Sequence, residues 1–229
     1  MKQRARALCL SACVVIPLLL TLCEVVCVGS SAAGQDRGTL VAQALRARQL
    51  GKASLSLGVT LDTSIDERFD SIKSAVSFFI ATKTAKPPVQ AADPDFIYTW
   101  HTLHLERVLS APAISQRVCG RDIPKVVQLE PDEIAVPLLG GEATVEGVAV
   151  TMTSRNPQPS FEVGRRYLFI GALCPGGTVS LPFQDSSVIL VASDGTIGPS
   201  AALHPFTFVG EIVGFKQLAE LELRLREHR

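Results

Sequence analysis

The residues best suited to contact a ligand form an alternating aromatic row. Phe96, Tyr98 and Trp100 are spaced at i, i+2 and i+4 in a stretch rich in aromatic and branched residues. On a β-strand this spacing points all three side chains to one face, and a row of exposed rings can stack on nucleobases or sugar rings. Such a row can instead pack in the core, with the tyrosine hydroxyl and the indole N–H at a polar rim. The row is therefore a candidate ligand platform, with core packing as its alternative.

A pair of histidines resembles a metal-binding motif. His101 and His104 form an H-x-x-H pattern, which brings two imidazoles together on a helix but directs them to opposite faces of a strand. No cysteine or carboxylate cluster lies nearby to complete a site. We therefore expect ordinary histidines and no metal at this position.

A second pattern resembles a calcium-binding loop. Its matching residues occupy the first, third, fifth and ninth positions and are Asp62, Ser64, Asp66 and Asp70. The positions that require glycine and glutamate hold Glu67 and Lys73 instead. Ser64 followed three residues later by Glu67 is also a helix capping box, so helix capping explains these residues and no cofactor is predicted.

No motif in the sequence predicts a catalytic residue. A G-x-S-x-G elbow is absent, and the four histidines belong to no catalytic motif. The sequence thus favours a non-enzymatic protein. A hydrolase remains the alternative, because catalytic groups can be brought together by the fold without leaving a linear motif.

The first 33 residues have the pattern of a secretory signal peptide. Basic residues at positions 2, 4 and 6 precede an almost unbroken apolar run over 7–22, and Ser31-Ala32-Ala33 offers a small-residue cleavage site. The alternative is an uncleaved membrane anchor over 7–28, which reaches the necessary length of about 20 residues only by including Glu24. We therefore expect an exported protein, periplasmic or extracellular, that touches a membrane only if this segment is retained.

The cysteines and the charge balance further define the exported chain. Four of the six cysteines lie in residues 1–33, which leaves Cys119 and Cys174 and predicts a disulfide between them. The alternative is two separate thiols. Of the 22 basic and 22 acidic residues, three and one lie in residues 1–33, so acidic residues slightly exceed basic ones in the remainder. This balance does not suit a nucleic-acid-binding protein.

Several short strands separated by turns are the main structural signal. The most strand-like run follows a turn within 161–173, and its residues over 167–173 place apolar side chains on both faces. Further strands are expected at 76–84, 96–109, 145–153 and 187–192, and near 133–139 up to a break at Gly140-Gly141. Helical spacing predicts a helix over 65–75 and a C-terminal helix over 215–227 with Phe215, Leu218, Leu221 and Leu225 as its apolar stripe. A shorter helix can form over 40–50, ahead of an extended stretch.

The segment Gly164-Arg165-Arg166-Tyr167-Leu168-Phe169-Ile170-Gly171 resembles the G-x-x-Y-L-I-x-G strand of the netrin-module and metalloproteinase-inhibitor (NTR) superfamily. The stretch from Tyr98 to Leu109 is similar to the long strand that precedes it, and the combination resembles uncharacterised exported bacterial proteins. The resemblance implies an OB-type barrel over about 76–191. It transfers no functional residue, since the inhibitor branch begins with a zinc-binding cysteine and the expected mature start here is Gly34-Gln35.

Together these patterns predict a mainly β protein: a small OB-like barrel with one preceding helix and a C-terminal helix, after an N-terminal signal segment. The expected divisions are a signal peptide over 1–33, a loosely structured segment over 34–63, the barrel with its leading helix over 64–210, and the C-terminal helix over 211–229. The expected function is a non-enzymatic binding or interaction module of the cell envelope, with an envelope protein or a glycan as partner. The alternative is an envelope hydrolase or a protease inhibitor.

Overall fold

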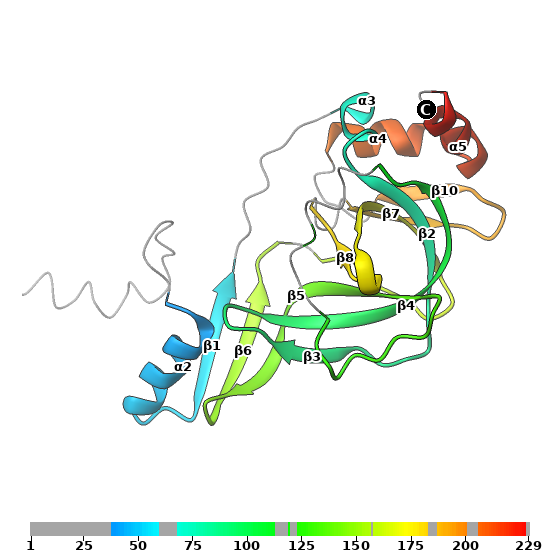
Figure 1. The fold of residues 1–229 in the computed structure, drawn as a ribbon. Coiled ribbons are helices and arrows are strands. Elements are labelled where there is room, and N and C mark those ends of the chain that lie inside the picture. Colours follow the sequence, from blue (N-terminus) through cyan, green and yellow to red (C-terminus); the bar gives the residue numbers. More distant parts are fainter. Residues whose placement is uncertain are drawn as a thin grey trace, which may run out of the picture. The chain divides into compact units, whose positions relative to one another are not determined.

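The computed structural model describes residues 38–59, 68–112, 119, 123–156, 158–182, 187–200 and 206–227 (Figure 1). All of them belong to one compact unit, Gly38–Arg229. The predicted signal peptide over 1–33 and its anchor alternative over 7–28 lie outside the described residues. Among the helices of the described ranges, none combines the length and the apolar character needed to cross a membrane.

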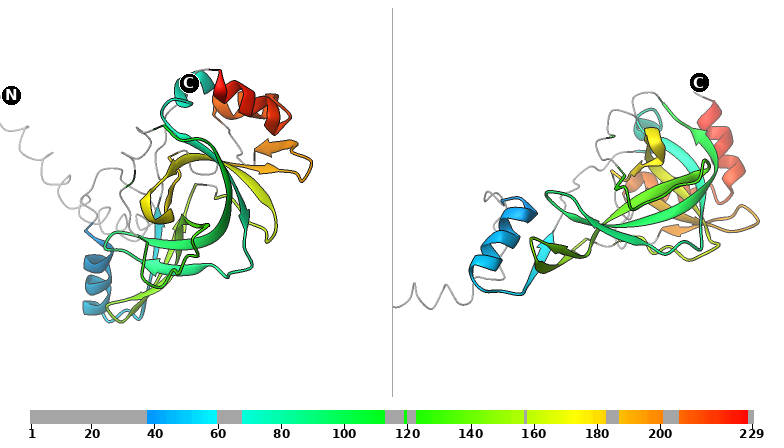
Figure 2. Two further views of the ribbon diagram at one scale, coloured as in Figure 1. Left: turned by 45° about the vertical axis from the view of Figure 1, so that its right-hand side comes forward. Right: turned by 60° about the horizontal axis from the view of Figure 1, so that its bottom comes forward.

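Five strands curl into a half-barrel (Figures 1 and 2). They are β2 (Ser77–Lys83), β4 (Ile97–Ser110), β5 (Glu133–Val145), β7 (Arg166–Leu173) and β8 (Val179–Ser180). β2 pairs with β4 on one side and with β7 on the other, while β4 continues to β5 and β7 to β8, all antiparallel. A parallel bridge between Ala135 and Thr178 brings the two ends of this series together. The predicted mainly β fold is confirmed, and these strands form a curled half-barrel within a ten-stranded sheet.

Both faces of β7 are buried, as its sequence predicts. Successive side chains of a strand alternate between faces, so neighbouring residues of β2 and β7 belong to different cores. Phe79 and Phe169 point into the barrel, where their rings stack with centroids 5.2 Å apart. Phe78 and Leu168 point outward and pack against helices. The central strands are therefore apolar throughout.

Three helices cover the outer face of these strands: α3 (Phe69–Ile72), α4 (Thr207–Gly214) and α5 (Leu218–Arg226). α5 buries Leu218, Leu221 and Leu225, which confirms most of the predicted apolar stripe. Phe215 is not part of α5, because it ends α4, a helix that the sequence analysis missed.

The predicted helix over 65–75 is shorter in the structure. Its helical part is α3, followed by turns over residues 73–75, and residues 65–67 lie outside the described ranges. Glu211 of α4 receives the first N–H of α3, with Phe69 N 2.7 Å from its Oε2. A distant carboxylate thus supplies the N-terminal partner that we expected from the local capping box.

The N-terminal segment carries the short helix and the extended stretch that the sequence analysis allowed, and it is more regular than the loose segment expected over 34–63. α2 (Leu40–Gln49) begins at Thr39, whose hydroxyl accepts a hydrogen bond from the N–H of Ala42. β1 (Ser54–Val59) then pairs in parallel with β6 (Val148–Ser154). α2 packs against β1, β5 and β6 and buries Leu40 and Ala44 in a separate core. This packing orders a segment whose local sequence pattern is weak.

Gly140-Gly141 does not break the strand that contains it, in contrast to our expectation. β5 is continuous across both glycines, but it pairs with β4 up to Leu139 and with β6 from Gly140 onward. The two φ angles are +119° and +132°, which only glycine adopts easily. The pair therefore lets one long strand pass from one partner strand to the next.

The remaining elements are short. β3 (Val89–Ala92) pairs with β4, and β9 (Val188–Val191) pairs with β7 and with β10 (Ile197–Ser200). A 3-10 turn, Pro175–Gly177, joins β7 to β8.

Candidate functional site

The aromatic row lies in the core around α2 and β6. Trp100 is 2% exposed and Tyr98 6%, while Phe96 is partly buried against the same cluster. The rings contact one another edge to face, with centroids 6.1 Å apart for Phe96 and Tyr98 and 6.3 Å apart for Tyr98 and Trp100. Burial removes their faces from solvent, so in this structure the row packs and does not form an exposed stacking surface.

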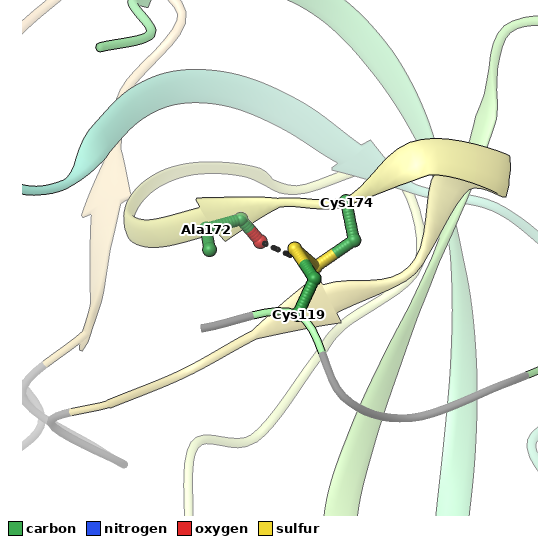
Figure 3. Close-up of a disulfide and its surroundings, with 3 residues drawn as sticks. All are labelled: Cys119, Ala172 and Cys174. Carbon is green, nitrogen blue, oxygen red and sulfur yellow. Dashed lines mark hydrogen bonds between the residues drawn. A yellow bond between two sulfur atoms is a disulfide. The ribbon is translucent and has the colours of Figure 1, made fainter. Parts of the chain in front are cut away.

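The predicted disulfide is present between Cys119 and Cys174 (Figure 3). Cys174 directly follows β7, and its N–H donates to the carbonyl of Thr178 at 2.8 Å. Its sulfur lies 3.8 Å from the carbonyl oxygen of Ala172. The disulfide therefore links Cys119 to the turn between β7 and β8. This turn lies where the two ends of the half-barrel meet.

The two histidines do not share a site. His101 contacts the ring of Phe161, with centroids 5.1 Å apart, whereas Nδ1 of His104 lies 2.9 Å from Oδ2 of Asp132 at the surface. Of the calcium-like residues only Asp70 is described, and it pairs with Lys73 and Arg224. Within the described ranges, no group of three or more histidine, cysteine, aspartate or glutamate side chains is placed to hold a metal ion.

A surface groove lies where the end of β4 meets α5; we call it the Val108 groove. Its main hollow has a volume of about 460 Å³, and a smaller one of about 260 Å³ adjoins it. Both are lined by Val108, which is 42% exposed. The other lining residues of the main hollow are Lys73, Ser74, Ser110, Ala111, Pro112 and Leu225. The volume falls in the range of small-ligand and peptide-side-chain pockets.

Two irregularities in β4 position this groove. Phe79 pairs with Val108 and Phe78 with Ser110, and Ile80 pairs with Arg107 while Ala81 pairs with Leu105. At each step β4 therefore has one residue more than β2, which is the arrangement of a β-bulge. Bulges bend a strand and redirect its side chains. Val108 lies between the two bulges and is exposed, whereas Phe79, its partner in β2, is a core residue.

The rim of the Val108 groove is mostly cationic. Arg107 and Arg226 line the smaller hollow and both pair with Glu222 of α5. Lys73 lines the main hollow, where it pairs with Asp70 and has its ammonium 5.8 Å from the centroid of the Phe69 ring. Among the charged lining residues, three are basic and one is acidic. An apolar floor with a basic rim suits an apolar group that carries a nearby carboxylate.

A second group of polar side chains lies at one end of the barrel. Lys83 is 4% exposed, and its ammonium donates to the carbonyls of Thr84 at 3.0 Å, Lys86 at 2.8 Å and Thr102 at 3.2 Å. Burial lowers the pKa of Lys83, and Glu133 opposes that shift. All three protons of the ammonium thus have an acceptor, which indicates a structural role.

His101 lies close to Lys83 and is the most strongly shifted group. Burial, followed by the positive charge of Lys83, lowers the pKa of His101 to about 4. Its Nδ1 is buried and has no hydrogen-bond partner among the described residues. Tyr167 lies in the same cluster, where burial raises its pKa and its hydroxyl accepts the N–H of Glu162 at 2.8 Å. The cluster therefore combines the neutral imidazole of His101 with the ammonium of Lys83, all three protons of which have an acceptor.

Sequence reasoning missed the Val108 groove. The apolar stripe of α5 was readable, but the bulges that expose Val108 depend on the register between two strands. The sequence did contain a weak indication of the buried cluster around Lys83, because Lys83 is the one charged residue in the mostly apolar strand over 77–83.

Comparisons with known proteins give no relatives: no family model, no curated protein and no solved structure matches this chain.

Proposed function

We propose that this protein is an exported, non-enzymatic binding module of the cell envelope, and that the Val108 groove is its ligand site. The observation that carries the proposal is a groove whose lining combines the exposed Val108 with three basic residues: Lys73 directly after α3, Arg107 of β4 and Arg226 of α5. Packing in the core accounts for the aromatic row and for the cluster around Lys83. It does not account for Val108, which lines a hollow and is exposed.

The expected ligand is an extended peptide segment of an envelope protein, with an apolar side chain next to aspartate or glutamate. The apolar side chain would contact Val108 and Leu225, and the acidic neighbour would meet the basic rim of Lys73, Arg107 and Arg226. A glycan, the other partner class suggested by the sequence, is favoured less because the aromatic row is buried.

Selection from a phage-displayed library of random peptides tests this assignment. The wild-type protein is expected to enrich peptides with an apolar residue beside an acidic one. Val108→Glu should weaken their binding at least about tenfold, because it places a carboxylate in the floor of the groove. The matched control is Val163→Glu, a valine that is 65% exposed and does not line the groove.

Failure to enrich any sequence motif, or equal binding by Val108→Glu and wild type, would overturn the groove as the ligand site. Retained binding by Val163→Glu is needed to assign the loss to the groove and not to a general effect of added charge.

One observation supports the alternative, an envelope hydrolase. A neutral, buried histidine beside a lysine is the kind of perturbed group found at active sites. However, Lys83 is fully engaged by carbonyl groups, and no hydrogen bond joins Nδ1 of His101 to any described nucleophile. Hydrolysis of ester, peptide or glycoside substrates that is lost in His101→Phe would favour this alternative.

Export and family are part of the same proposal. The Cys119–Cys174 disulfide supports export, because such bonds persist mainly in oxidising compartments. The curled half-barrel of strands supports an OB-type module of the NTR kind, for which the motif from Gly164 to Gly171 was the sequence signal.

A further inference from the structure

β1 forms one edge of the sheet and pairs only with β6 among the described strands. The N–H groups of Ala149 and Arg155 donate to the carbonyls of Ala53 and Val59, at 3.1 and 2.8 Å. Backbone groups of a strand alternate in direction, so every second residue from Ala53 faces β6. The N–H and carbonyl groups of Ser54, Ser56 and Gly58 therefore face away from the sheet, and no described residue pairs with them.

The opposite edge of the sheet is protected, whereas no comparable protection of β1 comes from the described residues. β10 contains Pro199 and a register irregularity, and the N–H of Ile197 donates to Lys216 between α4 and α5. Proline, bulges and charged residues are the usual means of preventing an edge from pairing with another chain. β1 has the sequence Ser-Leu-Ser-Leu-Gly-Val, without charge or proline, and stays in register with β6 over all six residues.

The sequence of β1 is self-complementary in the antiparallel direction. With a two-fold axis at Ser56, Ser56 faces its own copy, Ser54 faces Gly58, and Leu55 faces Leu57. The outward-facing groups then form about six N–H···O bonds. The paired residues are uncharged, so no like charges meet among them; the side chain of Arg155 lies over Gly58 on the exposed face.

Apolar surface next to this edge would also be covered. Leu55 and Leu57 are only partly buried and point to the face on which α2 packs. Leu45 of α2 is 39% exposed, and Leu50, directly after α2, is 66% exposed. Backbone pairing alone forms weak contacts, and flanking leucines supply the apolar burial that a stable dimer needs.

We propose that β1 is a dimerisation edge, on which two copies of this chain pair antiparallel about Ser56 and continue the sheet from one subunit to the other. This inference uses a different surface from the Val108 groove and does not depend on it.

Substitution at the axis tests the proposal on the full protein as purified from cells, with its disulfide intact. The side chain of Ser56 is exposed, so Ser56→Lys leaves the fold unchanged but places two like charges opposite each other. Sedimentation velocity is expected to show a wild-type dimer whose dissociation constant rises at least about tenfold in Ser56→Lys. Thr151→Lys is the matched control, because Thr151 pairs with Ser56 on the neighbouring strand and is exposed on the same face without lying at the edge.

Cysteine cross-linking tests the register. Ser56→Cys places two cysteines at the axis, about 5.5 Å apart between Cα atoms, which is within disulfide range. Mild oxidation should give a covalent dimer for Ser56→Cys and none for Ser54→Cys, whose copies are separated along the strand, or for Thr151→Cys.

A wild-type monomer, or equal dimerisation of wild type and Ser56→Lys, would overturn the proposal. So would equal cross-linking of Ser54→Cys and Ser56→Cys. A complex with a different protein that Ser56→Lys disrupts would show that the edge serves a foreign strand and not a second copy.

Discussion

At the scale of single residues, the barrel end depends on two buried basic side chains that are stabilised differently. Lys83 keeps its charge because three carbonyl oxygens surround its ammonium, whereas His101 is kept neutral by burial and by the charge of Lys83. A buried charge is tolerated only when it is paired or hydrogen-bonded. The ammonium of Lys83 meets that condition through its three hydrogen bonds. His101 is neutral at pH 7, so it places no charge in this region.

The depressed pKa of His101 predicts a loss of stability in mild acid. Its pKa is about 4 in the folded protein and about 6.5 in an unfolded chain. Between these values only the unfolded state takes up the proton, so the free energy of unfolding is highest above pH 6.5 and falls as the pH drops towards 4. Allowing for the partial exposure of the ring, we expect a loss of about 1 kcal/mol between about pH 7.5 and 5.5.

Urea unfolding at the two pH values measures this loss, and His101→Phe is the control because phenylalanine can keep the edge contact with Phe161 without titrating. The histidine is not responsible if the variant and the wild type lose the same free energy.

At the scale of elements, glycines determine how closely strands approach one another. A Cβ added at Gly171 of β7 would lie 2.3 Å from the carbonyl oxygen of Ser180 in β8, far inside van der Waals contact. Side chains of ordinary size therefore cannot occupy this position while β8 stays paired. The glycine that ends the NTR-like motif thus has a specific packing role at the point where the barrel closes.

Gly171→Ala is expected to lower the free energy of unfolding by about 2–3 kcal/mol through this overlap. Gly164→Ala is the comparison: its φ is +77° with nothing within 4 Å of the added Cβ, so only backbone strain of about 1 kcal/mol applies. Thermal or denaturant unfolding of both variants provides the measurement. A smaller effect at Gly171 than at Gly164 would contradict the close approach of β7 and β8.

At the scale of the whole molecule, residues far apart in sequence fasten the barrel. Cys119 and Cys174 are 55 positions apart and have Cα atoms 5.6 Å apart. The bond holds the connection between β4 and β5 to the turn after β7, while the Ala135–Thr178 bridge joins the same two parts of the sheet. A backbone bridge and a covalent bond therefore both join the two ends of the half-barrel.

Replacing both cysteines by alanine is expected to lower the free energy of unfolding by about 2–4 kcal/mol, since the unfolded chain loses its cross-link. Urea unfolding checks the magnitude, and the wild-type protein unfolded with reductant should match the double variant. Intact mass after alkylation without reductant provides a direct test: labelling of Cys119 and Cys174 would show that the bond is absent. The same spectrum reports whether residues 1–33 are retained.

The sequence by itself determined the locations of most strands, the apolar stripe of α5 and the pairing of Cys119 with Cys174. These features follow from local periodicity, from residue shape and from the small number of cysteines outside residues 1–33, so local patterns suffice. Tertiary structure decided the rest. Several features depend on which strands are neighbours and in which register: the burial of Trp100, the passage of β5 through Gly140-Gly141, the bulges on either side of Val108 and the position of β1 at an edge of the sheet. That information arises from contacts between residues distant in the chain, which no local pattern contains.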